Sequence, residues 1–569
     1  MSEFYNAFIS YGRADSKTFA ATLCDRLTEA GFAIWFDKND IPLGVDFQEQ
    51  INDGIQKADN FVFVIAPHSV NSPYCLKEIQ LAIHYRKRII PLLHVEEISY
   101  NTWKERNPNG TLEQWEEYKA NGLHSSYPNM HPEIGRINWV YFREHLDDFE
   151  TSLEGLANLF RQHTVYVRQH TEILDRAVDW ERDRKPNRRL LSGGDRLAAM
   201  SWLKRRFEGE QPPCFPTDLH CEYISESIKN ANNLMTHVFI SYADVDRPTM
   251  ENIARSLMRE ALTIWTNKTD IKAGTQFKKE IEKGIEGADS IVYLISEKAL
   301  ESQYCQQEIQ YALSLNKRII PVLVKPTDLD KIASEILSVQ FIDLSQAENE
   351  PEYHQGIDRL VAQLQEDTVY FDRHKVLLVK ALKWRQQNEN TSLLLRGYSL
   401  KQAKTWLELA QKRERDRPLP IHIDYISVSA NQPPTISLDV FIGYTPEDGD
   451  FTRCLNDALQ IQGKTTWFDL ENLEEDIDAA PQLRSGIEQC DNFLFVISPQ
   501  SVQSENCLTA LDYAAELGKR IVAIVYRVGL VVEPPPVLAE VPTVDFKQHD
   551  GDFNANLGDL IRTLDTDRE

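Results

Sequence analysis

The strongest constraint in this chain is an internal repeat, because one pattern of segments occurs three times along its 569 residues. The stretch NAFISYGRAD around Phe8 recurs as HVFISYADVD around Phe239 and as DVFIGYTPED around Phe441. A tryptophan follows these phenylalanines at offsets of 27, 26 and 26 residues. The stretches FVFVIAPHSV, IVYLISEKAL and FLFVISPQSV then match, as do RKRIIPLLHV, NKRIIPVLVK and GKRIVAIVYR. Such self-similarity predicts one supersecondary unit built three times.

The matching runs have the length and composition of buried strands. Each holds apolar, β-branched or aromatic residues between polar turns, as do strands of a parallel sheet covered on both faces. Helical spacing separates them, since Phe19, Leu23 and Leu27 recur every four residues. Alternating strands and helices require crossover connections. We therefore predict α/β repeats, each a flavodoxin-like, doubly wound parallel sheet that binds ligands at the carboxyl ends of its strands.

A second, shorter repeat lies between these copies. Residues 164–225 match residues 368–427 with helical spacing, which predicts two small helical modules. The first copy also has an insertion at about 97–136 that is rich in Asn, Gly and Pro and predicts a surface excursion. The expected domains are a first repeat (1–163), a first helical module (164–234), a second repeat (235–367), a second helical module (368–432) and a degenerate third repeat (433–569).

Composition argues against several classes of function. The chain has 62 basic and 87 acidic residues, a net charge of −25, which disfavours nucleic acid and anionic membrane as partners. No run approaches the ~18 apolar residues of a spanning helix, and the amino end has no signal-peptide pattern, so we expect a soluble cytoplasmic protein. The eight cysteines lie far apart, and there is no phosphate loop or zinc motif. We expect no metal and no cofactor.

Three motifs, taken together, resemble a known family. The FISY strand, the segment WFDKNDIPLG after it and the segment SPYCLKEI are similar to those of the TIR domain, the Toll/interleukin-1 receptor homology domain. The resemblance implies a five-stranded parallel sheet and self-association, with other TIR domains or copies of this chain as partners. Some TIR domains are adaptors that only bind other TIR domains. Others take NAD+ as substrate and cleave its nicotinamide–ribose bond with a glutamate on the third helix.

Mapped onto this chain, the catalytic glutamate is Glu78 in the first repeat and Glu308 in the second. The family's aromatic residue four positions earlier is Tyr74 or Tyr304. Residues four apart on a helix share a face, so each ring and carboxylate point into the same space. The ring can stack on nicotinamide or adenine, and the carboxylate can stabilise the positive charge that develops when nicotinamide leaves.

The third repeat departs from this pattern. Ala510 occupies the glutamate position and Asn506 the aromatic position, while Gly443 replaces the serine of FISY. Glu505 lies five positions earlier and would point elsewhere on the helix. We therefore expect no NAD+ cleavage by this repeat.

The resemblance also assigns substrate-binding residues around each carboxylate. The loop after Trp35 corresponds to the family's BB loop, a frequent contact between TIR domains. Arg13 is a candidate for pairing with the pyrophosphate, and the second repeat has Asp244 at that position. The predicted residues are Ser10, Tyr11, Arg13, Asp37, Asp40, Gly44, Ser72 and Tyr74 in the first repeat, and Ser241, Tyr242, Asp270, Gly274, Ser302 and Tyr304 in the second.

We expect from these patterns a signalling or defence protein that hydrolyses or cyclises NAD+ when assembled, with Glu78 and Glu308 as catalytic residues. One alternative is a non-enzymatic scaffold that recruits other TIR proteins, and another is a receptor that binds an NAD-derived ligand without turnover. The same fold hosts these different roles. What separates them is whether Glu78 lines a cleft with Tyr74, Ser10 and the BB-loop backbone.

Overall fold

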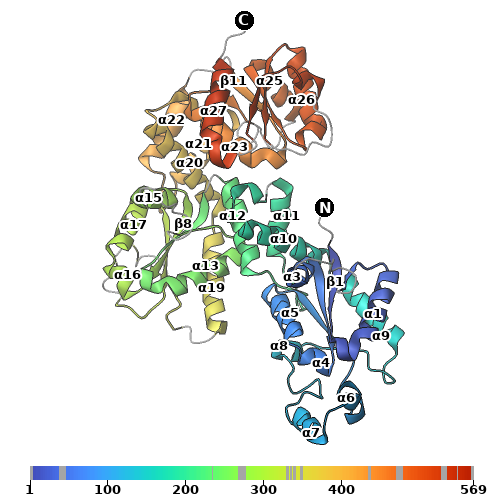
Figure 1. Ribbon diagram of the computed structural model, residues 1–569. Helices are drawn as coiled ribbons and strands as arrows, with labels where there is room; N and C mark the ends of the chain where they lie inside the picture. Colours follow the sequence, from blue (N-terminus) through green and yellow to red (C-terminus); the bar gives the residue numbers. More distant parts are fainter. Residues whose placement is uncertain are drawn as a thin grey trace. The chain divides into compact units, whose positions relative to one another are not determined.

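Figure 1 shows the computed structural model of the chain. It divides into two compact units. One comprises Met1–Lys185 with Ser201–Cys221, and the other comprises Pro186–Met200 with Glu222–Glu569. No helix in the described part of the chain is long and apolar enough to cross a membrane. The described residues are 4–36, 47–191, 193–232, 235–266, 277–328, 332, 336, 341–346, 350–432, 438–468, 479–526, 535–546 and 549–565.

Each repeat contains a five-stranded parallel sheet, which confirms the predicted fold class. In the first repeat the strand order is β2-β1-β3-β4-β5, so the chain reverses direction across the sheet next to β1, as in doubly wound folds. The other two sheets have the same order. The strands are β1 (Tyr5–Ser10), β2 (Ile34–Trp35), β3 (Ala58–Ile65), β4 (Arg88–Leu93) and β5 (Val140–Tyr141); β6 (Thr236–Ser241), β7 (Ile264–Trp265), β8 (Ala288–Ile295), β9 (Arg318–Leu323) and β10 (Ile342–Asp343); and β11 (Leu438–Gly443), β12 (Thr466–Trp467), β13 (Cys490–Ile497), β14 (Arg520–Val525) and β15 (Thr543–Asp545).

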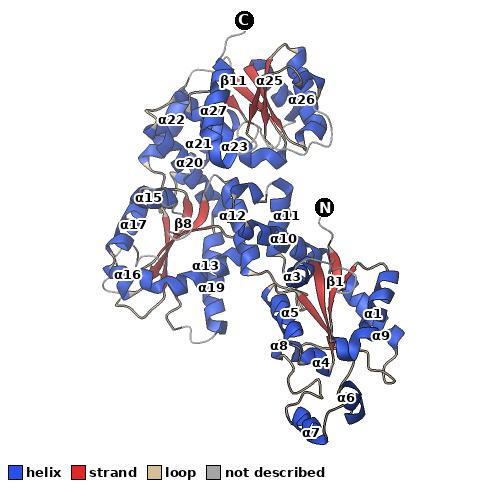
Figure 2. Ribbon diagram, viewed as in Figure 1, coloured by secondary structure: helices blue, strands red, loops and turns tan. Residues whose placement is uncertain are grey.

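Helices cover both faces of every sheet (Figure 2). Successive residues of a strand point to opposite faces, so Val62 of β3 packs against the first and last helices of its repeat while Phe61 packs against the two middle ones. The first and last helices are α1 (Arg13–Glu29) and α9 (Phe149–Arg161), α13 (Arg247–Arg259) and α19 (Glu350–Gln365), and α23 (Gly449–Ile461) and α27 (His549–Asp565). The middle helices are α3 (Phe47–Lys57) and α5 (Pro73–His84), α15 (Phe277–Glu286) and α17 (Gln303–Ser314), and α25 (Ala479–Gln489) and α26 (Glu505–Glu516).

The tryptophan of each repeat is held between a phenylalanine and a glycine. Trp35 stacks on Phe8 with ring centroids 4.4 Å apart, and Trp265 and Trp467 stack likewise on their own phenylalanines. A Cβ atom added at Gly54 would lie 2.6 Å from the Trp35 ring, which is closer than packed atoms can approach. Glycine therefore lets the middle helix lie directly on the indole.

The insertion in the first repeat folds around its own aromatic core. Helices α6 (Tyr100–Arg106) and α7 (Leu112–Ala120) bury Trp103 and Trp115 together with Ile98. Arg106 forms an ion pair with Asp15 at the start of α1 and so ties the insertion to the sandwich. The surface excursion expected from its Asn, Gly and Pro content is thus a small ordered subdomain, because its two tryptophans pack against each other.

Each helical module begins directly after the last helix of a repeat, at a residue with left-handed backbone. These residues are His163 and Asp367, with φ angles of 55° and 52°. Inside each module two histidine rings pack against each other and against a tryptophan: His170, His220 and Trp202 in the first, and His374, His422 and Trp406 in the second. The module helices are α10 (Thr164–Arg182), α11 (Gly193–Lys204), α12 (Asp218–Ala231), α20 (Thr368–Gln386), α21 (Gly397–Ala410) and α22 (Pro420–Asn431).

The first helix of each module is attached to the repeat before it by an ion pair. Arg168 of α10 lies 2.8 Å from Asp59 at the start of β3, and Lys375 of α20 lies 2.9 Å from Asp289 at the start of β8. The equivalent Asp491 of the third repeat is exposed. Each of the first two repeats therefore forms one packed body with the first helix of its module.

A Lys-Arg pair precedes or begins the fourth strand of each sheet and binds both helical layers. Lys317 donates to the carbonyl oxygens of Glu286 and Ala288, where α15 ends and β8 begins. Arg318 donates to carbonyl oxygens at the end of α19 on the other face, including that of Glu366 at 2.7 Å. The corresponding pairs Lys87-Arg88 and Lys519-Arg520 make the same kinds of contact.

The glycine beneath the tryptophan gives a first prediction. Gly54→Ala is expected to lower the free energy of unfolding by about 1–3 kcal/mol, because the added methyl group must displace the Trp35 ring. Gly155→Ala in α9 is the matched control: nothing lies within 4 Å of its added Cβ, so helix propensity predicts a gain of up to about 1 kcal/mol. Urea unfolding of both variants measures the difference. Equal stability of the two would contradict the close packing.

The buried histidines predict loss of stability in acid. Burial lowers the pKa of His220 to about 3 and that of His422 to about 4, and it also lowers the pKa values of His170 and His374. The unfolded chain therefore binds more protons below its ordinary histidine pKa of about 6.5, and stability falls as the pH drops from there.

At pH 5 each histidine whose folded pKa lies below 5 is expected to cost about 2 kcal/mol relative to pH 7.5. Urea unfolding followed by tryptophan fluorescence at the two pH values tests this. His422→Asn should reduce the pH difference, whereas His354→Asn, at an exposed position, should leave it unchanged. A pH difference that His422→Asn does not alter would refute the assignment.

Candidate functional site

The predicted glutamates occupy equivalent positions on α5 and α17. Ser302 caps the start of α17, where its hydroxyl oxygen accepts a hydrogen bond from the Cys305 amide at 3.4 Å. Cys305 is buried against the sheet, and Tyr304 beside it is 68% exposed. Glu308 is half-buried one turn further along, on the same side of the helix as Tyr304. This local arrangement follows directly from the helical spacing of the sequence.

A serine at the end of the first strand holds the Glu308 carboxylate. Ser241, which ends β6 and is 1% exposed, donates a hydrogen bond of 2.6 Å to Glu308 Oε2. Burial raises the pKa of Glu308 to about 7, while the bond from Ser241 acts in the opposite direction by favouring the charged form. The group is therefore near the midpoint of its titration at neutral pH, a feature typical of catalytic carboxylates.

Glu308 and Tyr304 line a cavity of about 380 Å³ between α15 and α17. Its wall on α15 has two apolar side chains, Ile281 and Ile285, and two charged ones, Lys278 and Glu282. The remaining lining residues are on α17: Gln307, Gln310 and Tyr311. The sequence analysis did not identify these lining residues, although their spacing of three and four residues places them on one side of each helix.

The first repeat has the same elements with one different contact. Ser72 caps α5 by accepting a hydrogen bond from the Cys75 amide, Tyr74 is 64% exposed and Glu78 is half-buried. Ser10, the counterpart of Ser241, is 1% exposed, and its hydroxyl has no hydrogen-bond partner among the described residues. Burial raises the pKa of the Cys75 thiol to about 12, so this cysteine stays protonated and packs in the core.

Two predicted residues lie on the other side of the sheet. The Tyr11 ring stacks on Phe36, and it packs in the apolar cluster beneath α1 rather than beside Glu78. Tyr242 packs in the same way beneath α13. Arg13 lines a different cavity, with residues of α1, the end of β4 and the β5–α9 loop. The structure thus brings Ser241, Ser302, Tyr304 and Glu308 together around one helix. Tyr242 packs beneath α13 but lies near enough to Glu308 for that carboxylate to contribute to its raised pKa.

Five of the predicted substrate-binding residues lie outside the described residues. They belong to the loop after the conserved tryptophan in the first and second repeats, and they are Asp37, Asp40, Gly44, Asp270 and Gly274. The predicted part of this loop in substrate binding stays a prediction.

In the third repeat a glycine and an aromatic ring replace the serine at the end of the first strand. A Cβ atom added at Gly443 would lie 2.9 Å from the Phe493 ring, so that ring takes the space next to the end of β11. Ala510 stands where the other repeats have glutamate, and Asn506 is exposed where they have tyrosine. Cys507 remains buried and Ser504 still caps the helix. The scaffold is retained while the polar groups around the carboxylate are lost.

Relatives match short parts of this chain. A probable 2' cyclic ADP-D-ribose synthase of Brachypodium distachyon, BdTIR, is 33% identical over 91 residues, which are 16% of this chain and 41% of that protein. The NAD(+) hydrolase TcpC of Escherichia coli is 27% identical over 95 residues, 16% of this chain and 31% of that protein. The chain therefore spans less than half the length of these relatives.

Solved structures also match parts of this chain. The TIR domain of the Toll-related receptor TRR-2 from Hydra magnipapillata is 22% identical and covers 22% of this chain and 98% of its own, with a TM-score of 0.20. A metazoan TIR-STING receptor from C. gigas is 20% identical, covers 29% of this chain and 57% of its own, and has a TM-score of 0.19. The family model of the TIR domain matches residues 7–116, 238–361 and 440–561, more than half of the chain. The chain belongs to the TIR domain family.

Proposed function

We propose that this chain cleaves NAD+ at the nicotinamide–ribose bond, with Glu308 as the catalytic carboxylate of the second repeat and Glu78 as that of the first. The observation that carries the proposal is the bond from Ser241 to Glu308 at the wall of a cavity that Tyr304 also lines. The relatives described as an NAD(+) hydrolase and a cyclic ADP-ribose synthase support the same chemistry.

The reaction breaks the bond between ribose C1′ and the nicotinamide nitrogen. Both bonding electrons leave with nicotinamide, whose positive charge is thereby neutralised, and positive charge develops on C1′ and the ring oxygen of the ribose. An ionised Glu308 stabilises that charge because the half-buried site screens it less than water would. Water then attacks C1′ and loses a proton to give ADP-ribose, or a hydroxyl of the same molecule attacks to give a cyclic product.

Two neighbours of Glu308 have separate tasks in this proposal. Ser241 fixes the orientation of the carboxylate through one oxygen, Oε2, which leaves Oε1 for the substrate. Tyr304 offers an exposed ring four positions earlier, on which the planar nicotinamide or adenine stacks. Because the ring is 68% exposed, we propose that a neighbouring TIR domain covers it and that cleavage depends on assembly of this chain with other TIR domains or with itself.

We assign the third repeat a structural or regulatory part in such assemblies. What supports this is the combination of Ala510 with the Phe493 ring against Gly443, which leaves neither the carboxylate nor the hydroxyl that orients it.

Substituting the glutamates tests the proposal directly. Nicotinamide release from NAD+ is measured with concentrated full-length protein for Glu78→Gln, Glu308→Gln and the double variant. The substitution in an active repeat is expected to lower the rate of that repeat at least about a hundredfold, since the charge facing the transition state is removed. Glu505→Gln in the third repeat is the control and should keep the wild-type rate.

The alternative of a non-enzymatic scaffold has its own outcome. If wild-type protein releases no nicotinamide although light scattering shows that it has assembled, the scaffold function replaces the enzyme. A double variant that keeps the wild-type rate would show that other residues do the chemistry.

The raised pKa of Glu308 predicts the pH dependence of the second repeat. In Glu78→Gln protein, nicotinamide release should rise with pH around 7 and then level off, because the ionised form of Glu308 is the active one. Ser241→Ala removes the bond that favours this form, so the midpoint should move to higher pH. If Ser241→Ala lowers kcat without moving the midpoint, the serine only supports the local structure.

A further inference from the structure

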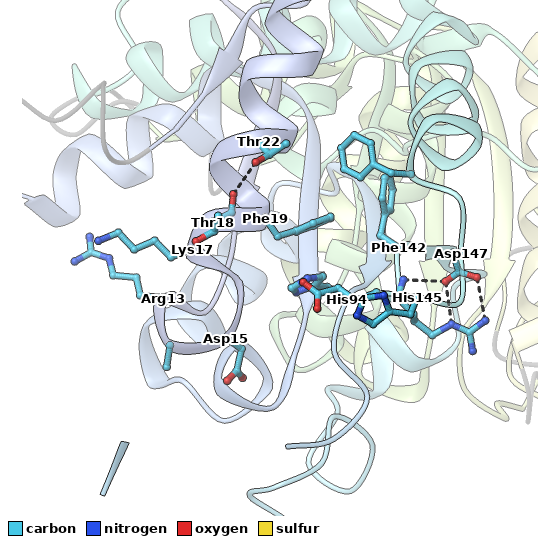
Figure 3. A pocket seen from close by; sticks show the side chains of 14 residues that line it. Arg13, Asp15, Lys17, Thr18, Phe19, Thr22, His94, Phe142, His145 and Asp147 are labelled. Atoms are coloured by element: carbon cyan, nitrogen blue, oxygen red, sulfur yellow. Dashed lines mark hydrogen bonds and ion pairs between the residues drawn. The ribbon is translucent and has the colours of Figure 1, made fainter. Parts of the chain in front are cut away.

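Besides the Glu308 cavity of the second repeat, the structure has a cavity in the first repeat. Neither of the predicted catalytic glutamates lines it. Its volume is about 830 Å³, within the range of pockets for small ligands. It is lined by residues 13–22 of α1, by His94 after β4 and by residues 142–149 after β5 (Figure 3). We name this cavity the α1 pocket. It lies at the carboxyl ends of parallel strands, where doubly wound sheets bind their ligands.

One end of the α1 pocket is cationic. Arg13 and Lys17 lie four residues apart on α1 and therefore share a face of the helix, and both line the pocket at the same end (Figure 3). Gly12 caps α1 without a side-chain hydrogen bond, so amide groups of the first turn add partial positive charge. The one carboxylate of that turn, Asp15, is already bound by Arg106 and by the amide of His68.

The middle of the pocket is aromatic and holds an unsatisfied polar atom. His94 stacks on Phe19 with ring centroids 4.1 Å apart and planes 14° apart. His94 is 5% exposed, and its Nδ1 atom lies 2.9 Å from the Ser16 hydroxyl. Its Nε2 atom has no hydrogen-bond partner among the described residues. A buried polar atom of this kind is costly unless something satisfies it, which points to a ligand group.

The opposite end of the pocket is polar and carries charges of both signs. Phe142, His145 and Asp147 lie there (Figure 3). There Arg143 neutralises Asp147 through a contact of 2.9 Å. Glu144 is exposed and lies close enough to His94 to oppose the lowering of the pKa of that ring by burial. An exposed carboxylate suits hydrogen-bond donors such as sugar hydroxyls or an amino group.

The other two repeats lack this set of groups. In the second repeat Asp244 and Val324 stand at the positions of Arg13 and His94, and the basic residue near the Lys17 position, Arg247, forms an ion pair with Asp244. In the third repeat these positions hold Pro446, Asp450 and Tyr526. The pair Arg13 and His94 is therefore a property of the first repeat, whereas an aromatic stack recurs in the third, where Phe451 and Tyr526 have ring centroids 4.0 Å apart.

We propose that the α1 pocket binds a nucleoside phosphate. The phosphate lies at the amino end of α1 between Arg13 and Lys17, the base packs beside the stacked Phe19 and His94 rings, and the donors of the sugar or base face Glu144. The cationic end and the aromatic middle of the cavity lie in the order of the phosphate and the base of such a ligand. The proposal concerns binding alone and does not depend on cleavage of NAD+.

Isothermal titration of the full chain with AMP, inorganic phosphate and adenosine tests the pocket. AMP is expected to bind saturably and more tightly than either of its parts. Arg13→Gln combined with Lys17→Gln should weaken AMP binding at least about tenfold, because two charge-assisted contacts are lost. Lys119→Gln, at an exposed position on α7, is the matched control and should leave the affinity unchanged.

Other outcomes overturn the proposal. Inorganic phosphate that binds as tightly as AMP reduces the pocket to an anion site, and adenosine that binds as tightly as AMP removes the role of Arg13 and Lys17. AMP binding that the double variant does not weaken belongs to another site, such as the cavity of Glu308. Thermal unfolding of each variant shows that it is folded, so a lost affinity cannot be ascribed to unfolding.

Discussion

The architecture of every repeat depends on a Lys-Arg dipeptide at the start of the fourth strand. Neighbouring residues in extended backbone point to opposite faces of a sheet, so Lys317 reaches the end of α15 on one side and Arg318 reaches the end of α19 on the other. Burial lowers the pKa of Lys317 to about 7, a cost that carbonyl oxygens at hydrogen-bond distance offset. The helical layers on both faces are thereby attached to the sheet at the start of its fourth strand.

The candidate catalytic site is built on this framework. Ser241 at the carboxyl end of β6 donates to Glu308 of α17, and Cys305 of the same helix packs in the core beneath it. The third repeat keeps the Lys-Arg contacts and the buried cysteine but places the Phe493 ring against Gly443. The same framework thus carries a polar site in the second repeat and an apolar filling in the third, so the fold alone does not decide the function.

The two cavities use opposite faces of this framework. The cavity with Glu308 lies between middle helices, whereas the α1 pocket lies beside the first helix of its repeat. The insertion contributes indirectly to the α1 pocket, because Arg106 neutralises the carboxylate of Asp15 in the first turn of α1. Repeats of one fold can in this way carry different sites in different copies. The residues that line the cavities are not part of the shared core, so they can differ between repeats.

The sequence by itself determined what depends on local periodicity: the three sheets, the helices between them, and the common face of Tyr304 and Glu308 or of Tyr74 and Glu78. It also located the copy that lacks the carboxylate, at Ala510. Only the tertiary structure decided that the rings of Tyr11 and Tyr242 pack beneath the first helix of their repeats, that Ser241 binds Glu308, and that Arg13 and His94 line one cavity. The reason is physical: these contacts join residues tens of positions apart, and their geometry is set by how helices pack on the sheet, which no local spacing records.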